Sequence, residues 1–459
     1  MPIVAGVDSS TQSVKIVLRD SDSGELIAST SRPHPDGSEV NPQHWWKALS
    51  EALDELSSHK ISAISIAGQQ HGMIALDKDG TVIRDALLWN DARSDKAAEN
   101  LNREIPDIAL RTGSQLVASF TASKVRWLAD SEKANANRVA AIALPHDWLS
   151  WQLSGGAHIS TLFTDRSDAS GTGYFDSVKN EYCRDIFAIA LRSKSDVILP
   201  KIVAPGSFGG ESSFGIPIAA GVGDNAGAAL GLGSNIGDLV ISLGTSGTAF
   251  SLSETPTHDS TGEVAGFADA TGNFLPLACT LNAAKIFATI SRTLGISFEE
   301  FSSLALSAKA GAEGLRVIPH FDGERTPNKP KAEGSFHGVT HSNFTKSNIA
   351  RAAIEGVVAG MLYAAEAIER LGVKYSRVLL IGGAAKNSAV QQIAADLFGH
   401  VIHIPPLGEY VADGAAKQAA WALSGNKELP KWSLGEVLEI HPSKDAEEVR
   451  ASYMGLIRD

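Results

Sequence analysis

The sequence is poor in cysteine. Its 459 residues include only Cys183 and Cys279, which lie far apart along the chain. Two separated cysteines argue against a disulfide framework and against a cysteine-based metal cluster. We therefore expect the protein to work in a reducing compartment, of which the cytoplasm is the simplest.

Positive charge is scarce relative to negative charge. The chain has 40 Lys and Arg against 52 Asp and Glu, which gives a formal net charge of −12. A chain of this charge is not expected to bind nucleic acid or an anionic membrane surface. If the protein binds phosphate groups, backbone amides and a metal ion must supply much of the attraction.

Long hydrophobic runs are also missing. No stretch reaches the roughly 18 apolar residues that a membrane-spanning helix needs. Asp8 interrupts the apolar residues near the start, so we expect no secretory signal. A chain of 459 residues exceeds the size of one hydrophobic core, and two domains are therefore expected.

Several motifs of well-defined chemistry are absent as well. The sequence has no G-x-x-x-x-G-K-[ST] element, which removes the P-loop route to ATP. It also lacks the set of motifs that marks a protein kinase, and it has no H-E-x-x-H or G-x-S-x-G element. Protein kinases and common hydrolases are therefore not expected.

The sequence does contain one structural pattern that occurs twice. Two apolar runs flank a polar turn at residues 3–20, and strand, turn and strand return at residues 238–252. The first unit continues with a helical pattern and a strand of the fully buried type, residues 42–58 and 61–68. The second unit continues with strand, Gly-Gly turn, helix and strand, residues 375–405. We expect two α/β domains, residues 1–234 and 235–459.

The two turns correspond to each other and are rich in hydroxyl groups. "DSSTQS", which begins at Asp8, aligns with "SLGTSG", which begins at Ser242, and Thr11 then stands opposite Thr245. Backbone N–H groups and hydroxyls of such turns can hold phosphate oxygens. A carboxylate at Asp8 would need a cation such as Mg²⁺ between itself and phosphates. An ordinary hairpin turn explains the same composition, so both interpretations stay open.

A glycine-dense stretch around "GVGDNA", residues 221–226, has two functional interpretations. The dinucleotide-binding pattern requires an acidic residue about 20 positions later, and the strand there ends in Gly244 and Thr245 instead. The other interpretation makes Asp224 a general base for a substrate hydroxyl, with Asn225 bonded to a polyol. A plain alternative is that the two residues start a helix.

Two further groups suit a sugar and a nucleotide. Polar side chains around an aromatic ring make a plausible sugar pocket, and they are Gln69, Gln70, His71, Trp89, Asn90, Asp91 and Arg93. Taken alone, His71 is as well explained as a loop or core residue. Gly382 and Gly383 precede a helix that Asn387 or Ser388 can cap, and glycine there would let adenine or ribose approach the backbone. A tight strand–helix turn is the alternative.

These stretches, in this order, resemble the FGGY carbohydrate kinases of the actin, Hsp70 and hexokinase superfamily. The resemblance runs through nearly the whole chain, and the stretches that carry it are "GVDSSTQSVKIVL", "AGQQHGM", "LWNDARS", "SFTASKVRWL", "LPHDWLSWQLSG", "TDRSDASGTGYFD", "GVGDNAGAALGLG", "SLGTSGTAFS", "DGERTPN", "LIGGAAKN" and "DGAAKQAAWAL". It implies an α/β fold of two ribonuclease-H-like domains that flank a central cleft. It also implies an enzyme that takes ATP, Mg²⁺ and a small sugar, with no nucleic-acid or membrane partner. A homodimer is compatible with it.

The resemblance also implies roles for individual residues. Asp224 matches the catalytic base, and Asp8 matches the acid near Mg²⁺ and the phosphates. The residues that match nucleotide-binding positions are Thr11, Gly244, Thr245, Ser246, Gly382, Gly383 and Asn387. The residues expected to contact the sugar are Gln70, His71, Asn225, Trp89 and Asp91.

Departures from the family pattern bear on the acceptor. Ser10 stands where a glycine is common in the first turn, and Gln12 follows Thr11. Gln70 stands where members that act on D-xylulose often have Met. We expect phosphorylation of D-xylulose at its 5-hydroxyl, with L-xylulose, ribulose, glycerol or erythritol as alternatives. A nucleotide-switched binding protein of the actin or Hsp70 kind is the alternative from another class. The role of "GERTP", residues 323–327, is left open.

Overall fold

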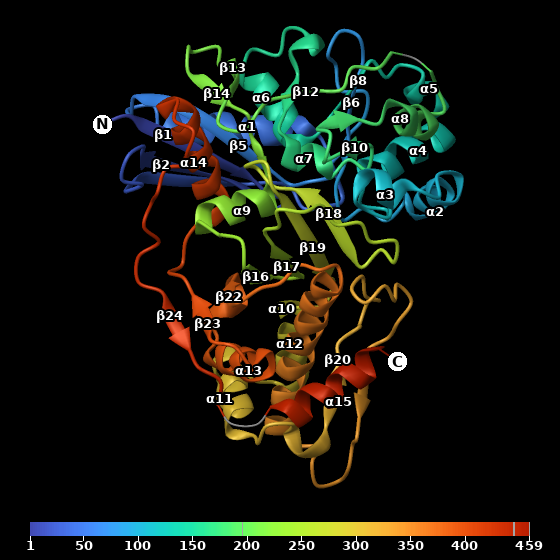
Figure 1. Ribbon diagram of the computed structural model, residues 1–459, viewed down its shortest axis with the longest axis vertical. Coiled ribbons are helices and arrows are strands. Elements are labelled where there is room, and N and C mark those ends of the chain that lie inside the picture. Colours follow the sequence, from blue (N-terminus) through green and yellow to red (C-terminus); the bar gives the residue numbers. More distant parts are fainter. Residues whose placement is uncertain (195, 444–445, 459) are drawn as a thin grey trace.

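The chain forms two lobes, each built around a mixed β-sheet with helices packed on it (Figure 1). The computed structural model describes residues 1–194, 196–443 and 446–458. The last strand of the first sheet ends at Gly223, and the first strand of the second sheet begins at Asp238. The predicted boundary between residues 234 and 235 falls between these two strands.

The first sheet has the order β13-β14-β5-β1-β2-β3, and β15 also pairs with β5. β1 pairs with β2 in an antiparallel hairpin and with β5 in parallel. The strands of this sheet are β1 (Ile3–Ser9), β2 (Ser13–Asp20), β3 (Leu26–Pro33), β5 (Ile61–Gly68), β13 (Phe208–Glu211), β14 (Pro217–Ala219) and β15 (Val222–Gly223).

Helices and short strand pairs complete the first lobe. The helices are α1 (Pro42–Glu55), α2 (Asp95–Glu104), α3 (Ile108–Thr112), α4 (Thr121–Ser131), α5 (Lys133–Ala136), α6 (Pro145–Leu153), η1 (Ile159–Thr161), α7 (Arg166–Ser170), α8 (Arg184–Leu191) and α9 (Asp224–Leu232). The paired short strands are β4 (Glu39–Val40) with β7 (Ala86–Leu87), β6 (Ile74–Leu76) with β8 (Ala141–Ala143), β9 (Phe163–Thr164) with β12 (Lys201–Ile202), and β10 (Phe175–Asp176) with β11 (Glu181–Tyr182).

The second sheet repeats this plan in the order β18-β19-β17-β16-β22-β23-β24. β16 pairs with β17 in an antiparallel hairpin and with β22 in parallel, as β1 does with β2 and β5. Its strands are β16 (Asp238–Leu243), β17 (Gly247–Ser251), β18 (Val264–Ala268), β19 (Phe274–Thr280), β22 (Arg377–Ile381), β23 (Ile402–Ile404) and β24 (Leu438–Ile440). β20 (Arg316–Ile318) and β21 (Ser335–His337) form a separate pair.

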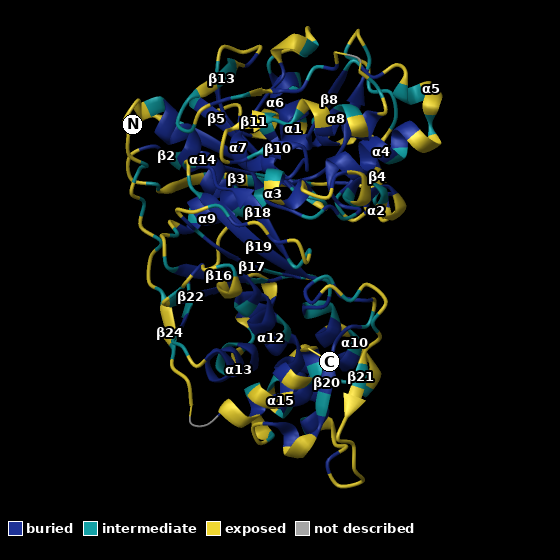
Figure 2. Cartoon of the chain, turned by 45° about the vertical axis from the view of Figure 1, so that its right-hand side comes forward, coloured by how far each residue is buried: buried dark blue, intermediate teal, exposed yellow. Residues whose placement is uncertain are grey.

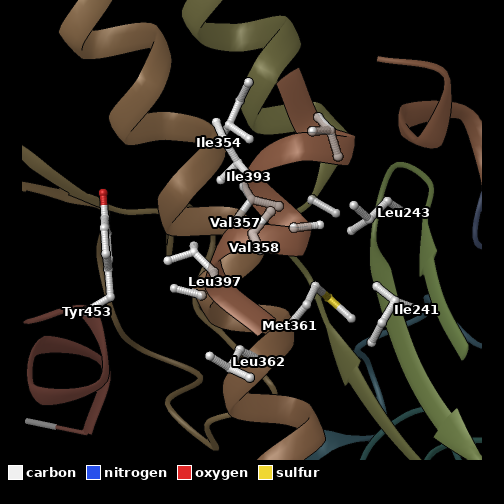
Figure 3. Packing of buried hydrophobic residues seen from close by; sticks show 14 of the residues in the cluster. Ile241, Leu243, Ile354, Val357, Val358, Met361, Leu362, Ile393, Leu397 and Tyr453 are labelled. Atoms are coloured by element: carbon white, nitrogen blue, oxygen red, sulfur yellow. The ribbon is translucent and has the colours of Figure 1, made fainter. Parts of the chain in front are cut away.

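The helices of the second half are α10 (Ala284–Leu294), α11 (Phe298–Ser307), η2 (Ala312–Gly314), α12 (Lys346–Arg370), η3 (Gly383–Lys386), α13 (Ser388–Phe398), α14 (Tyr410–Ser424) and α15 (Glu447–Arg458). Most of α12 is buried, and Figure 3 shows its apolar side chains packed together with those of α13 and β16. The interior of both lobes is apolar, and exposed residues concentrate on loops and outer helix faces (Figure 2).

One helix crosses between the halves of the chain. α14 packs on β1, β5 and α9 of the first lobe, although it follows the last parallel strand of the second sheet. Gly6 allows this close approach, since a Cβ there would lie 1.9 Å from the carbonyl oxygen of Ala412. The loop that leads into α14 therefore lies at the junction of the two lobes.

Candidate active site

A cavity of about 720 Å³ lies between the two sheets. The first lobe contributes Asp8 at the end of β1, and Asp224 and Asn225 at the start of α9. The second half contributes the end of β22, the turn that follows it, and the loop before α14. Its volume and its position at the ends of parallel strands suit a nucleotide-sized ligand.

Asp8 is an unpaired carboxylate in this cavity. It is 6% exposed, and its Oδ1 atom has no hydrogen-bond partner among the described residues. Burial raises the pKa of Asp8 to about 7; Lys15 lowers that pKa, and the charges of Asp224 and Glu409 add to the rise. A carboxylate oxygen without a partner in this position fits the first of the two interpretations of the turn, in which Asp8 faces a hard cation.

Asp224 is the first residue of α9, after Gly223 in an extended conformation. Burial raises the pKa of Asp224 to about 6, and two hydrogen bonds from Asn225 oppose that rise. Both the backbone N–H and the side-chain amide of Asn225 donate to Oδ1 of Asp224, each at 2.7 Å. Asn225 thus orients the carboxylate, and a pKa near neutrality suits a general base.

The predicted Gly-Gly turn forms one wall of the cavity. A Cβ on Gly382, whose φ is 93°, would lie within 2.9 Å of backbone atoms of Leu243. A Cβ on Gly383 would meet nothing within 4 Å. Gly382 is therefore required by the packing of the turn, whereas Gly383 leaves open space on the cavity side.

The other predicted nucleotide-binding residues do not line this cavity. The hydroxyl of Thr11 accepts a hydrogen bond from Nε1 of Trp89 at 2.9 Å. Asn387 caps α13, because its Oδ1 accepts from the N–H groups of Ala389 and Val390. Gly244, Thr245 and Ser246 form the hairpin turn between β16 and β17. The helix-capping prediction for Asn387 is confirmed, and phosphate contact by the two hairpin turns stays a prediction.

His71 is held in a constrained position at the end of the loop after β5. Its φ of 70° lies in the left-handed region, and its carbonyl accepts from Thr121 and Lys124, both at 3.2 Å. The ring nitrogen Nδ1 lies 2.6 Å from the carbonyl oxygen of Gly171, so Nδ1 carries the proton and Nε2 is left as an acceptor. Burial lowers the pKa of His71 to about 3, with Lys124 as the next cause. The ring is therefore neutral at physiological pH.

One short helix, α7, contacts several predicted site residues at once. The carbonyl of Ser167 accepts from Nε2 of Gln70 at 2.9 Å, and the Ser167 hydroxyl accepts from the N–H of Gly223 at 3.1 Å. That hydroxyl donates in turn to Asp165 at 2.6 Å. Since Gly223 precedes Asp224, α7 fixes the start of α9 and the position of Gln70 together.

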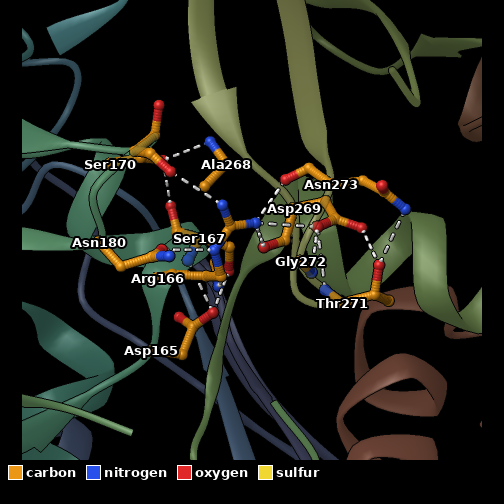
Figure 4. Close-up of polar contacts among 12 residues, drawn as sticks. Asp165, Arg166, Ser167, Ser170, Asn180, Ala268, Asp269, Thr271, Gly272 and Asn273 are labelled. Atoms are coloured by element: carbon orange, nitrogen blue, oxygen red, sulfur yellow. Dashed lines mark hydrogen bonds and ion pairs between the residues drawn. The ribbon is translucent and has the colours of Figure 1, made fainter. Parts of the chain in front are cut away.

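The far side of α7 binds the second lobe. Arg166 pairs with Asp269 at 3.1 Å and also donates to the carbonyl of Asn273, in the turn between β18 and β19 (Figure 4). The hydroxyl of Ser170 accepts from the N–H of Ala268 at 3.0 Å. Both members of the Arg166–Asp269 pair are buried. We call Arg166, Asp269 and the turn between β18 and β19 the clasp.

Asp91 is placed differently from the other predicted sugar contacts. It is 4% exposed, and its carboxylate accepts from Ser38 at 2.8 Å and from Arg93 at 2.8 Å. The carboxylate of Asp91 is therefore hydrogen-bonded to protein partners on both of its oxygen atoms. Contact between Asp91 and a sugar stays a prediction, as it does for Trp89.

A buried cluster of His146, Asp147 and Asp168 also has the residue types of a metal site. Nδ1 of His146 lies 2.5 Å from Asp168 and 3.2 Å from Asp147. Burial opposes the charge on His146, but the two carboxylates outweigh it and raise the pKa of His146 to about 10. A hydrogen-bonded imidazolium explains the cluster, because a separation of 2.5 Å leaves no room for an ion between the two atoms.

Sequence reasoning found the acids Asp8 and Asp224 of the nucleotide-sized cavity but missed its cations and Glu409. Lys15, Arg19 and Lys386 line it, and Nζ of Lys15 lies 2.6 Å from Glu409. The expectation that amides and a metal would do much of the phosphate binding did not include these three cations. The "PPLGE" turn before α14 was a usable signal for Glu409, whereas Lys15 looked like an ordinary exposed position of β2.

Comparison with known proteins identifies the family. The family model described as "FGGY family of carbohydrate kinases, N-terminal domain" matches residues 3–231, and the C-terminal domain of the same family matches residues 239–423. The chain belongs to the FGGY family of carbohydrate kinases. It is a sugar kinase, an enzyme class whose substrates are ATP and a sugar, and the expected family and fold are confirmed.

Several relatives carry a more specific name. A xylulose kinase of Streptomyces coelicolor is 42% identical over 92% of this chain and 89% of its own length. A xylulose kinase of Escherichia coli is 32% identical over 92% of this chain and 91% of its own length. The crystal structure of xylulose kinase from Bifidobacterium adolescentis has a TM-score of 0.92 and 41% identity, and covers 99% of each chain. No described helix is long and apolar enough to cross a membrane.

Proposed function

We propose that this sugar kinase transfers the γ-phosphoryl group of ATP to the 5-hydroxyl of D-xylulose, giving D-xylulose 5-phosphate and ADP. Support comes from relatives named xylulose kinase at 42% and 40% identity, each over 92% of the chain. The observation that carries the mechanism is the pair of carboxylates, Asp8 and Asp224, on one cavity between the lobes.

Asp224 serves as the general base. Its carboxylate, oriented by Asn225 and with its pKa raised to about 6 by burial, accepts the proton of the attacking hydroxyl. His71 presents a neutral ring whose Nε2 accepts a hydrogen bond from a sugar hydroxyl. Gln70, fastened to Ser167, forms the adjoining wall. The chemistry then depends on positioning and electrostatics, as in phosphoryl transfer generally.

The nucleotide occupies the cavity. Gly383 leaves room for the adenosine part, and Lys15 and Lys386 bring positive charge to the phosphates. Asp8, with its buried unpaired oxygen, would hold Mg²⁺. When bound, the ion offsets the phosphate charge beside the two acids. The proposal includes phosphate binding by the two hairpin turns, at Thr11 and at residues 244–246.

The test is ADP release from Mg²⁺-ATP with a panel of acceptors: D-xylulose, L-xylulose, D-ribulose, L-ribulose, glycerol and erythritol. We expect D-xylulose to give the highest kcat/KM by at least about tenfold, a difference that a few directional hydrogen bonds supply. If another acceptor is preferred, the assigned sugar changes, and the proposed mechanism of phosphoryl transfer is retained. ADP release that no acceptor increases would contradict the proposal.

A further inference from the structure

The segment "GERTP", residues 323–327, has no role in the mechanism above, and the structure places one of its residues near the acceptor site. Arg325 belongs to the second lobe. It lines a small cavity together with Phe120 and Gln115 of the first lobe and with Cys279 of β19. The ring of Phe120 lies 4.9 Å from the ring of His71. Arg325 therefore faces the part of the first lobe that carries His71.

The backbone on both sides of Arg325 is firmly anchored. The carboxylate of Glu324, 3% exposed, accepts from the N–H groups of Leu281 at 2.6 Å and of Arg325 at 2.8 Å. The hydroxyl of Thr326 donates to the carbonyl of Glu263 at 2.8 Å. The loop is thus fixed to the end of β19 and to the start of β18, so the Arg325 side chain starts from a rigid base.

The guanidinium of Arg325 itself is unused. Within the described parts of the chain it has no hydrogen bond and no ion pair, and only its backbone N–H is bonded. Half-buried arginines in protein interiors normally pair with an acid or a carbonyl. Five N–H donors without protein partners, on a side chain that lines a cavity shared by the two lobes, indicate that a ligand supplies the acceptors.

The charge of Arg325 affects the pKa values of two neighbouring groups, His71 and Cys279. After burial and Lys124, the charge of Arg325 is a further cause that lowers the pKa of His71. Burial raises the pKa of the Cys279 thiol, and both Arg325 and Asp224 act on that same thiol. Both influences agree with the position of Arg325 on the cavity beside Phe120. The nucleotide-sized cavity, in contrast, is lined by Asp224 and not by Arg325.

We propose that Arg325 is an acceptor-binding residue of the second lobe, which donates hydrogen bonds to oxygen atoms of a ketose held by His71 on the first lobe. This inference rests on the proposed function. It assigns Arg325 to the end of the sugar remote from the transferred phosphoryl group, because Asp224 lines the nucleotide-sized cavity and Arg325 does not. A sugar bound in this way bridges the two lobes and favours their closure.

The test compares steady-state kinetics of the wild type with Arg325→Ala and Arg325→Lys. Arg292→Ala is the matched control, since Arg292 is an exposed arginine of α10 in the same lobe. We expect Arg325→Ala to raise KM for D-xylulose by about tenfold to a hundredfold, the value of hydrogen bonds from a charged donor. KM for ATP should change by less than about twofold, and Arg325→Lys should recover part of the loss.

Thermal unfolding separates binding from a structural role. Removal of an unpartnered guanidinium should leave Tm within about 2 °C of the wild type. An unchanged KM for D-xylulose would overturn the proposal, as would an equal rise of KM for ATP, or a large loss of Tm that Arg325→Lys does not restore. If the wild type prefers another acceptor, the comparison is made with that acceptor. If no acceptor increases ADP release, the proposed function fails, and the assignment of Arg325 fails with it.

Discussion

At the scale of single residues, the proposed active site contains two carboxyl groups whose pKa values burial raises toward neutral pH. Burial raises the pKa of Asp8 to about 7 and that of Asp224 to about 6, and each lies on the cavity between the lobes. A carboxylate with a raised pKa is a stronger base once it is ionised. The same burial destabilises the ionised form in the absence of a ligand.

Substitution of Asp224 tests this directly. Asp224→Asn should lower kcat by at least about a hundredfold, because the amide accepts no proton. In the wild type, kcat/KM should rise with pH through about 6 to about 7 and then level off, since both Asp224 and Asp8 must be ionised. A pH series of ADP release measures both effects. Near-normal turnover by Asp224→Asn would contradict the assignment of the base.

Stability should respond to Asp224→Asn in the opposite direction. A raised pKa means that the folded protein binds more protons than the unfolded chain between about pH 4 and pH 6. The ionisation of Asp224 therefore lowers the free energy of unfolding as the pH rises through that window. Asp224→Asn should unfold at a higher Tm than the wild type at pH 7.5, with the difference vanishing below pH 4.

Substitutions of the two adjacent glycines, Gly382 and Gly383, separate a packing role from a role in nucleotide binding. Gly383→Val should fold normally and raise KM for ATP by about tenfold or more, because its side chain would enter the cavity. Gly382→Ala should instead lower stability by about 2 kcal/mol, since it combines a positive φ with a clash against Leu243. Thermal unfolding and ATP titration separate the two. If Gly383→Val left KM for ATP unchanged, the nucleotide would lie elsewhere.

At the scale of elements, α7 holds together the residues that are proposed to form the acceptor site. Its two serines bond to Gln70, to Gly223, which precedes the proposed base, and to Ala268 of the other lobe. The residue after α7, Gly171, bonds to His71. A segment this short has no independent stability, so these tertiary bonds hold α7 and the site residues in place together.

Two serines of α7 distinguish positioning from mere stability. Ser167→Ala removes the acceptor for the Gly223 N–H, and kcat should fall by about tenfold to a hundredfold through displacement of Asp224. Ser170→Ala removes the bond from the N–H of Ala268 and the bond to the carbonyl of Ser167, and it should cost about 1–3 kcal/mol in stability while kcat falls clearly less than in Ser167→Ala. Ser167→Thr should recover activity. Equal kinetic effects of the two alanine variants would argue against a positioning role.

At the scale of the whole molecule, the clasp and α14 join the two halves of the chain. Arg166→Leu should lower the free energy of unfolding by about 3–5 kcal/mol, because it leaves the buried Asp269 without its cation. Arg138→Leu is the control, since Arg138 pairs with Asp77 at the surface and should cost less than about 1 kcal/mol. Chemical denaturation measures both. A similar small loss in each variant would show that the clasp does not stabilise the lobes.

Much of the architecture follows from local sequence pattern. The hairpin of β1 and β2, the buried strand β5 and its repetition in β16, β17 and β22 were all predictable, because alternation and apolar runs are local signals. The helical pattern over residues 42–58 appears as α1, Pro42–Glu55. The packing of α14 on the first sheet was not predictable in this way, since the sequence of residues 410–424 does not indicate which sheet the helix packs against.

The same division holds for the site. The sequence by itself determined the family, the candidate base Asp224, the acid Asp8 and the Gly-Gly turn, because each belongs to a short motif with a local reason for its residues. Only the tertiary structure decided that Ser167 meets Gly223, 56 positions away, and that Gly171 meets His71, 100 positions away. Only the tertiary structure, too, placed Arg325 on a cavity with Phe120, whose ring lies beside that of His71. These contacts depend on how two sheets and their helices pack, and packing is a property of the whole chain.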